Sequence, residues 1–153
     1  MKKKIAMIMM ALSLTFGVVG VPQTVFAASG STSVLVSSGS VNIGDTVTVT
    51  VKASGPSGEK ANATMTLSYD SSVLQFVSCN TTYGGGGGSV MATGESYTVT
   101  LKAVSAGNSS LSVSANDGVI FDSNEEMDSM SGSSASVTVK NAASTNTDSG
   151  NNS

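Results

Sequence analysis

The chain has 153 residues, of which only 11% are charged, with 7 Lys and Arg against 10 Asp and Glu, one cysteine and no histidine. Apart from Lys2–Lys4 at its start, this acidic chain has no basic cluster to contact phosphate groups, so nucleic-acid binding is excluded. Without histidine and a second cysteine, the chain also lacks the ligands of a conventional zinc site and the base of a Ser-His-Asp triad.

The first 27 residues have the pattern of a secretory signal peptide. Lys2–Lys4 form a basic start, Ile5–Val21 is apolar, and Val25–Ala27 places small residues where a signal peptidase cleaves. An uncleaved membrane anchor is the alternative, but the apolar stretch is at the short limit of the roughly 17 to 25 residues that cross a bilayer. We therefore predict cleavage before Ala28, secretion to the extracellular space or the bacterial cell surface, and no membrane insertion afterwards.

Two segments of the mature chain, 46–52 and 61–69, alternate strictly between apolar and polar side chains. A period of two is typical of a β-strand with one buried and one solvated face. The predicted inward residues are Val47, Val49, Val51, Ala63, Met65, Leu67 and Tyr69. The segment 96–103 alternates strictly as well, with Tyr97, Val99, Leu101 and Ala103 inward, and shorter or weaker runs predict further strands at 33–36, 73–79, 89–92, 109–115 and 135–140.

Turn residues separate these runs, and no helical period occurs. Seven to nine short strands at regular spacing predict an all-β fold, an antiparallel β-sandwich with jelly-roll, Ig-like topology over residues 28–141. The five glycines Gly84–Gly88 predict a loop. Residues 142–153 are almost all Ser, Thr, Asn, Gly and Asp, which predicts a disordered linker or tail. Cys79 could form an intermolecular bridge, but a small apolar residue at a strand end is the favoured interpretation.

Several stretches, in this order, resemble a cohesin module, the type found in the scaffoldin proteins of cellulosomes. They are Gly44–Val49 (GDTVTV), Leu67–Ser78 (LSYDSSVLQFVS), Tyr97–Ala103 (YTVTLKA) with Ala106–Leu111 (AGNSSL), and Ser136–Val139 (SVTV). The resemblance extends from about residue 34 to 141. It implies a nine-stranded jelly roll related in fold to carbohydrate-binding modules, and a non-catalytic role in an extracellular polysaccharide-degrading or cell-surface assembly.

Cohesins bind dockerin modules through one face of the sandwich. The resemblance assigns that face to strands 61–69, 89–92 and 96–103, whose outward residues include Asn62, Thr64, Thr66, Thr98, Thr100 and Lys102. Direct carbohydrate binding is the second hypothesis, because sugar rings stack on aromatic faces. Tyr83, beside the glycine run, is the aromatic residue predicted to be exposed. The predicted partner is thus a dockerin-type protein module or a polysaccharide, and a structural spacer without a ligand is the alternative function.

Five acidic residues lie within a short segment and supply the oxygen ligands that Ca²⁺ prefers. They are Asp117, Asp122, Glu125, Glu126 and Asp128. Their order differs from that of the twelve-residue calcium loop, so a solvated acidic loop is the favoured interpretation. We therefore predict that the chain has no cofactor, and calcium binding is the alternative. Paired carboxylates also serve glycoside hydrolases, which need a substrate cleft between them. A chain this short and poor in aromatics predicts no such cleft, and we expect that it is not an enzyme.

Overall fold

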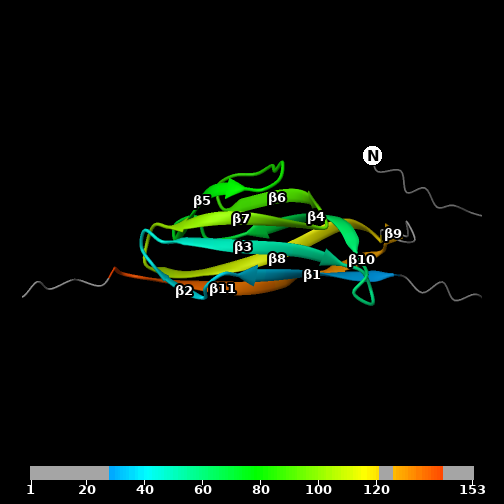
Figure 1. Ribbon diagram of the computed structural model, residues 1–153, viewed down its shortest axis with the longest axis horizontal. Helices are drawn as coiled ribbons and strands as arrows, with labels where there is room; N and C mark the ends of the chain where they lie inside the picture. The colour runs from blue at the N-terminus through cyan, green and yellow to red at the C-terminus, as the bar shows by residue number, and fades with distance from the viewer. Residues whose placement is uncertain (1–27, 121–125, 143–153) are drawn as a thin grey trace, which may run out of the picture.

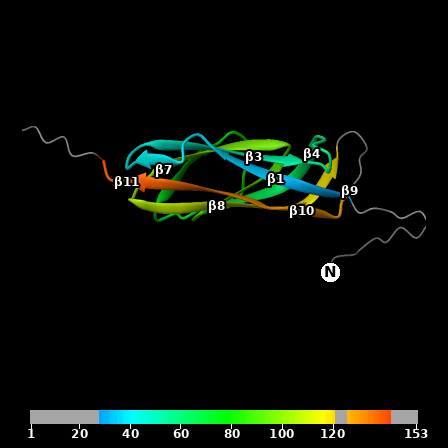
Figure 2. The same cartoon turned by 90° about the horizontal axis from the view of Figure 1, so that it is seen from below.

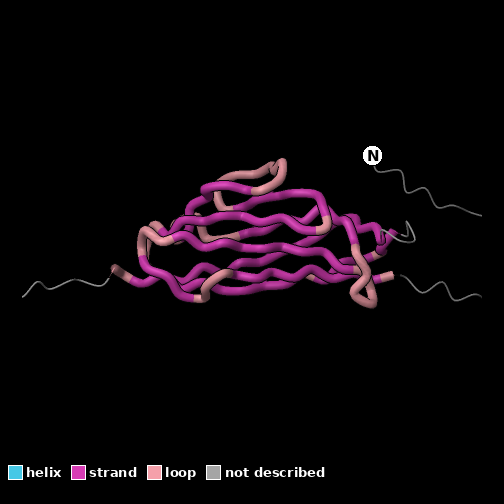
Figure 3. Tube along the Cα trace, viewed as in Figure 1, coloured by secondary structure: helices cyan, strands magenta, loops and turns pink. Residues whose placement is uncertain are grey.

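The computed structural model describes residues 28–120 and 126–142, which form two β-sheets packed face to face (Figures 1 and 2). One sheet has the strand order β10-β1-β3-β7-β5, and the other has the order β2-β11-β8-β4-β6, with β9 paired to β8. Every regular element in these two ranges is a strand (Figure 3). The predicted all-β sandwich is therefore confirmed.

The described residues contain eleven strands. They are β1 (Ser29–Val36), β2 (Ser40–Asn42), β3 (Thr46–Ser54), β4 (Ala61–Ser68), β5 (Leu74–Cys79), β6 (Ser89–Gly94), β7 (Ser96–Ala103), β8 (Gly107–Ile120), β9 (Glu126–Met127), β10 (Ser129–Ser131) and β11 (Ser133–Lys140). The predicted number of seven to nine is too low because β2, β9 and β10 have only two or three residues and cannot show a period. The ladders are antiparallel except where β1 pairs with β10 and β11 pairs with β2.

The core contains the side chains that the alternating pattern places inward. Val47, Val49 and Val51 of β3 are fully buried, as are Met65 and Leu67 of β4. The alternation has a simple cause, since successive side chains of a strand point to opposite faces of its sheet. Each long strand therefore contributes one apolar row to the space between the sheets.

Tyr97 supplies the polar link across this core. It lies on β7 of the five-stranded sheet, and its side chain is 1% exposed. Its hydroxyl group donates to the backbone oxygens of Met65 on β4 and Val90 on β6, each 3.3 Å away. Burial raises the pKa of the Tyr97 hydroxyl far above its ordinary value of 10.0. The aromatic ring thus fills the core while its polar end finds partners in the opposite sheet.

The two sheets end together at one edge of the sandwich. β5 is the last strand of one sheet and β6 the last strand of the other, and the loop between them rises at the top of Figure 1. Gly84 in this loop forms an isolated bridge with Met91 of β6. The glycine run predicted as a loop is therefore positioned over the β5–β6 edge.

Three of the five glycines in this loop have a backbone that requires glycine. The φ angles of Gly85, Gly87 and Gly88 are 125°, 60° and 102°, in the region that other residues rarely adopt. A Cβ atom on Gly88 would lie 2.8 Å from the backbone oxygen of Tyr69. The Tyr69 N–H also donates to the Gly88 oxygen at 2.8 Å. The run is thus held close against the end of β4 rather than extending freely from the fold.

Two of the predicted segments lie outside the described residues in whole or in part. The predicted signal peptide, residues 1–27, is not described, and of the predicted tail only residue 142 is. Across 28–120 and 126–142, no helix has the length and apolar character needed to cross a membrane.

Candidate functional site

The structure divides the predicted binding residues between opposite faces of the sandwich. Asn62, Thr64 and Thr66 point outward from β4 in the six-stranded sheet. The remaining strand residues, Thr98, Thr100 and Lys102, point outward from β7 in the five-stranded sheet. The expectation that the strands at 61–69, 89–92 and 96–103 share one face is therefore wrong for the last of them, because β4 pairs with β6 and β8 whereas β7 pairs with β3 and β5.

The outward side of β4, β6 and β8 forms a surface rich in hydroxyl groups, which we call the hydroxyl face. It consists of Asn62, Thr64, Thr66, Ser68, Met91, Thr93, Ser112, Ser114, Asn116 and Val119. Thr66 lies at its centre, between Met91 of β6 and Ser114 of β8. The Oγ1 atoms of Thr64 and Thr93 are 2.9 Å apart and share a hydrogen bond. Met91 is 47% exposed. Val119 is 37% exposed toward one end, so this face combines polar groups with a flexible apolar side chain near its centre and a second apolar side chain farther along.

Part of this face is absent from the predicted set. The alternation at 109–115 places Leu111 and Val113 inward, and Ser112 and Ser114 accordingly point outward. What the alternation does not reveal is that β8 pairs with β4, which brings these serines beside Thr66. Partner choice depends on long-range packing, and a local pattern carries little information about it.

The opposite side of the sandwich, which we call the lysine face, has a different composition. The outward residues of β3 and β7 form a ladder of threonines with lysines toward its two ends, namely Thr46, Thr48, Thr50, Lys52, Thr98, Thr100 and Lys102. Leu35 of β1 is paired with Thr50 and is 71% exposed. Positive charge and an isolated leucine thus distinguish this surface from the hydroxyl face.

A third feature, which we call the aromatic corner, lies beneath the glycine run and consists of Tyr69, Phe76 and Tyr83. The ring centroids of Phe76 and Tyr83 are 4.6 Å apart, with planes inclined at 44°. Tyr83 is 43% exposed, as its loop position predicts. Burial raises the pKa of Tyr69, an effect that a hydrogen bond from the Gly88 backbone partly offsets.

A hollow of about 310 Å³ opens beside these rings. Its lining residues are Tyr69, Ser71, Gln75, Phe76, Gly87 and Gly88. Tyr83 is not part of this lining and is connected to it through its contact with Phe76. Tyr83 therefore belongs to neither of the two sheet faces.

The five predicted calcium ligands are only partly described. Glu126 and Asp128 are exposed, Asp122 and Glu125 lie outside the described residues, and for Asp117 only the backbone position in β8 is described. Within 28–120 and 126–142, no three acidic or cysteine side chains gather as they would around a metal ion. Calcium binding by this segment stays a prediction.

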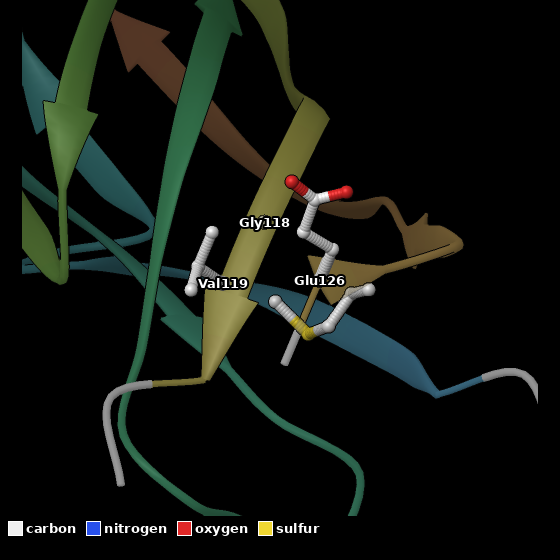
Figure 4. A pocket seen from close by; sticks show the side chains of 4 residues that line it. Gly118, Val119 and Glu126 are labelled. Carbon is white, nitrogen blue, oxygen red and sulfur yellow. The ribbon is translucent and has the colours of Figure 1, made fainter. Parts of the chain in front are cut away.

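A pocket borders the same segment (Figure 4). It is lined by Gly118 and Val119 of β8 and by Glu126 and Met127 of β9, which pair across the ladder between the two strands. Glu126 is the charged residue of this lining. One carboxylate supplies only a small part of the six to eight oxygens that Ca²⁺ takes. The described lining therefore does not form a calcium site by itself.

Comparisons with known proteins place this geometry in a wider context. The model of the cohesin domain family matches residues 32–152. Similar solved structures include a cohesin module from a family 33 glycoside hydrolase of Clostridium perfringens, at 14% identity and a TM-score of 0.58, covering 74% of this chain and 98% of that one. A comparison with proteins of curated function found no match.

Two more cohesins share the fold. A non-cellulosomal cohesin from the archaeon Archaeoglobus fulgidus is 14% identical with a TM-score of 0.52, covering 72% of this chain and 91% of that one. CaCohA2 from Clostridium acetobutylicum is 20% identical with a TM-score of 0.51, covering 76% of this chain and 94% of that one. CaCohA2 has also been solved in a complex with CaDoc0917. At these identities the likeness establishes a shared fold.

Proposed function

Because the chain belongs to the cohesin domain family, we propose that it is a secreted module that binds a dockerin-type protein module through its hydroxyl face. Cohesin modules are non-catalytic binding modules, so the expectation that the chain is not an enzyme agrees with its family. Cohesin modules are also generally extracellular or located at the cell surface. The signal peptide predicted at residues 1–27 fits secretion of this one.

The composition of the two sheet faces supports the choice of the hydroxyl face. The buried centres of protein interfaces are depleted in charged residues, Lys among them, and enriched in Met and aromatic residues. Around Thr66 the described side chains are uncharged, and Met91 lies directly beside it. The lysine face carries Lys52 and Lys102 at similar distances from its centre. Docking on the lysine face would bury or displace those charges, which costs free energy unless the partner supplies acids for both.

The strand pairing beneath the hydroxyl face also favours binding, because it holds the outward side chains in place before a partner arrives. β4 is paired on both sides, with β6 and with β8, so its outward side chains stand on a rigid surface. Hydroxyl groups donate and accept hydrogen bonds, which allows them to match either kind of partner group. A preformed surface loses little conformational entropy on association. Met91 can adapt its flexible side chain to an apolar contact from the partner.

Nothing on the hydroxyl face supports direct polysaccharide binding there. Its outward residues are hydroxyl and amide side chains with Met91 and Val119, and no aromatic ring among the described residues stands on it. A flat ring is the group on which sugars stack. We therefore assign the protein partner, rather than the polysaccharide, to this face.

A matched pair of variants tests the proposal. Thr66 and Thr100 are both partly exposed strand residues, the first on the hydroxyl face and the second on the lysine face. We would measure binding of a panel of purified dockerin modules, in the presence of calcium, by isothermal titration calorimetry. Thr66→Arg is expected to weaken binding about tenfold or more, because a bulky charge opposes close contact. Thr100→Arg is expected to leave the affinity unchanged.

The other outcomes identify the alternatives. Loss of binding in Thr100→Arg alone would transfer the docking site to the lysine face. If no dockerin module binds the folded wild-type protein, the structural spacer replaces the binding module as the proposed function. Circular dichroism of each variant, with the same melting temperature as the wild type, is the control for folding.

A further inference from the structure

We propose that the aromatic corner is a second binding site, separate from the hydroxyl face, which holds a neutral sugar residue of a polysaccharide. The hollow beside Tyr69 and Phe76 provides the space, and the glycine run provides one of its walls. This inference does not depend on dockerin binding.

The distribution of aromatic side chains is the first observation. Among the described residues the aromatic side chains are Tyr69, Phe76, Tyr83 and Tyr97. Tyr97 fills the core between the sheets, whereas the other three gather at one corner, where Tyr69 and Phe76 also pack against the core and Tyr83 is 43% exposed. An aromatic ring presents a broad apolar face to the C–H groups of a sugar, and the hydroxyl group of tyrosine adds a polar contact. Within 28–120 and 126–142, the accessible aromatic surface therefore lies at this corner and belongs mainly to Tyr83 and Phe76.

The polar groups around the hollow point to an uncharged ligand. Gln75 and Ser71 are exposed at its rim, and both can donate and accept hydrogen bonds. Gly87 adds exposed backbone without a side chain, whereas the backbone groups of Gly88 are already hydrogen bonded to Tyr69. None of the lining residues is charged. Apolar walls with a few convergent polar groups are typical of small-molecule sites, and a volume of about 310 Å³ is at the small end of their range, which suits one sugar residue.

The glycine run adds evidence that the corner is held in shape. Gly88 approaches the Tyr69 backbone more closely than any residue with a Cβ atom could, and their backbone groups are hydrogen bonded. Gly84 is tied to Met91 of β6 by its bridge. Between these two attachments the loop lies over the rings as a wall of backbone. A wall fixed at both ends loses little entropy when a ligand binds.

The hollow lies at the edge of the sandwich, and its glycine run meets the hydroxyl face at Met91. The hollow opens at the turn after β4 and along β5, on the edge that Figure 1 shows at the top. Gln75 lies in the five-stranded sheet, opposite Lys102 in the ladder, whereas Thr66 lies in the six-stranded sheet.

The test uses protein expressed from the full 153-residue sequence and labelled with ¹⁵N. We would titrate four neutral sugars while recording amide chemical shifts, namely cellohexaose, xylohexaose, mannohexaose and chitohexaose. Each sugar is added to roughly 10 mM, because a small open site is expected to bind with a Kd near the millimolar range. We expect one of these sugars to shift the amides of Gly84–Gly88 and Gln75. No shift with any of the four sugars would overturn the proposal.

Variants test whether the amide chemical shifts arise from sugar bound at the aromatic corner. Gln75→Ala removes one hydrogen-bonding group and is expected to weaken binding about fivefold, and Tyr83→Ala is expected to weaken it about tenfold. Val77→Ala, an exposed neighbour on β5 that does not line the hollow, should bind as the wild type does. Thr66→Arg should also bind the sugar normally, which separates this result from dockerin binding. Unchanged affinity in both Gln75→Ala and Tyr83→Ala would overturn the proposal.

Discussion

Replacing Tyr97 with phenylalanine removes one hydroxyl group, and that group links the two sheets. The ring is buried to 1% exposure, and the hydroxyl donates to the backbone oxygens of Met65 and Val90 at 3.3 Å. Phenylalanine fills nearly the same volume, so no cavity is expected. The effect of Tyr97→Phe on the free energy of unfolding is therefore confined to these hydrogen bonds.

The magnitude follows from the geometry. A hydrogen bond contributes about 0.5–1.5 kcal/mol net, and one hydroxyl proton at this length is shared between two acceptors. We expect Tyr97→Phe to lower the free energy of unfolding by about 1–2 kcal/mol. For a domain of this size that corresponds to a melting temperature lower by about 4–8 °C. Tyr97→Ala, which also leaves a cavity, should cost about 3–5 kcal/mol.

The same residue predicts how stability depends on pH. Burial raises the pKa of Tyr97 in the folded chain far above its ordinary value of 10.0. Its contribution is fully present below pH 10 and is lost as the pH rises above it, because the unfolded chain ionises there while the folded chain keeps the proton. The wild type should therefore lose stability above pH 10 more steeply than Tyr97→Phe. A smaller slope remains in the variant, since burial also raises the pKa of Tyr69.

Urea denaturation followed by circular dichroism, at pH 7 and at several values above 10, measures both effects. Equal stability of the wild type and Tyr97→Phe at pH 7 would show that the hydroxyl group contributes nothing net. Parallel stability curves above pH 10 would refute the assignment of the alkaline loss to Tyr97.

Three other predictions concern the loop, a turn and the N-terminus. Gly88→Ala should lower the free energy of unfolding by about 1–3 kcal/mol, because alanine is strained at the positive φ of this position. Gly86 has neither a positive φ nor a neighbour within 4 Å of its Cβ position, so Gly86→Ala should be neutral or stabilising by up to about 1 kcal/mol. Equal melting temperatures of the two variants would contradict the strain at Gly88. Hydrogen bonds from the Ser72 side chain and backbone lower the pKa of Asp70, so its contribution is present above its ordinary value of 3.8 and is lost as the pH falls below it. Asp70→Asn should flatten the acid side of the stability curve, and an unchanged acid limb in urea melts would contradict this. Mass spectrometry of protein secreted by a bacterial host should find Ala28 as the first residue, and an intact residue 1 would show that the signal is not cleaved.

The sequence predicts the strands well where the alternation is long. The segment 96–103 matches β7 (Ser96–Ala103) at both ends, and β3 and β4 differ from their predicted ranges by two residues or fewer. At β8 the prediction is short, because the strand continues from Ala115 through a bulge to Ile120 while it pairs with the start of β4. Glycine and acidic residues interrupt the period there, and the pairing with β4 overrides the local preference.

The sequence pattern predicts the candidate sites less well than it predicts the strands. Alternation shows that Thr66 and Thr100 are both outward, but a period of two is the same for every strand and does not say which sheet contains it. The exposure of Tyr83 follows from its place beside the glycines, and the structure confirms it. Its contact with Phe76 does not follow, because the bend that brings the loop back over β5 depends on the φ angles of the glycines.

The direction in which the chain enters and leaves the sandwich has a mechanical consequence. β1 begins at one end of the long axis and β11 finishes at the other (Figure 1). A force that pulls the two ends apart acts along both strands, while the hydrogen bonds of β1 with β3 and of β11 with β8 run across them. These bonds are loaded together in shear rather than opened one by one. In a chain of modules tethered between a cell and a solid substrate, this sandwich would therefore resist stretching and transmit tension from one neighbour to the next.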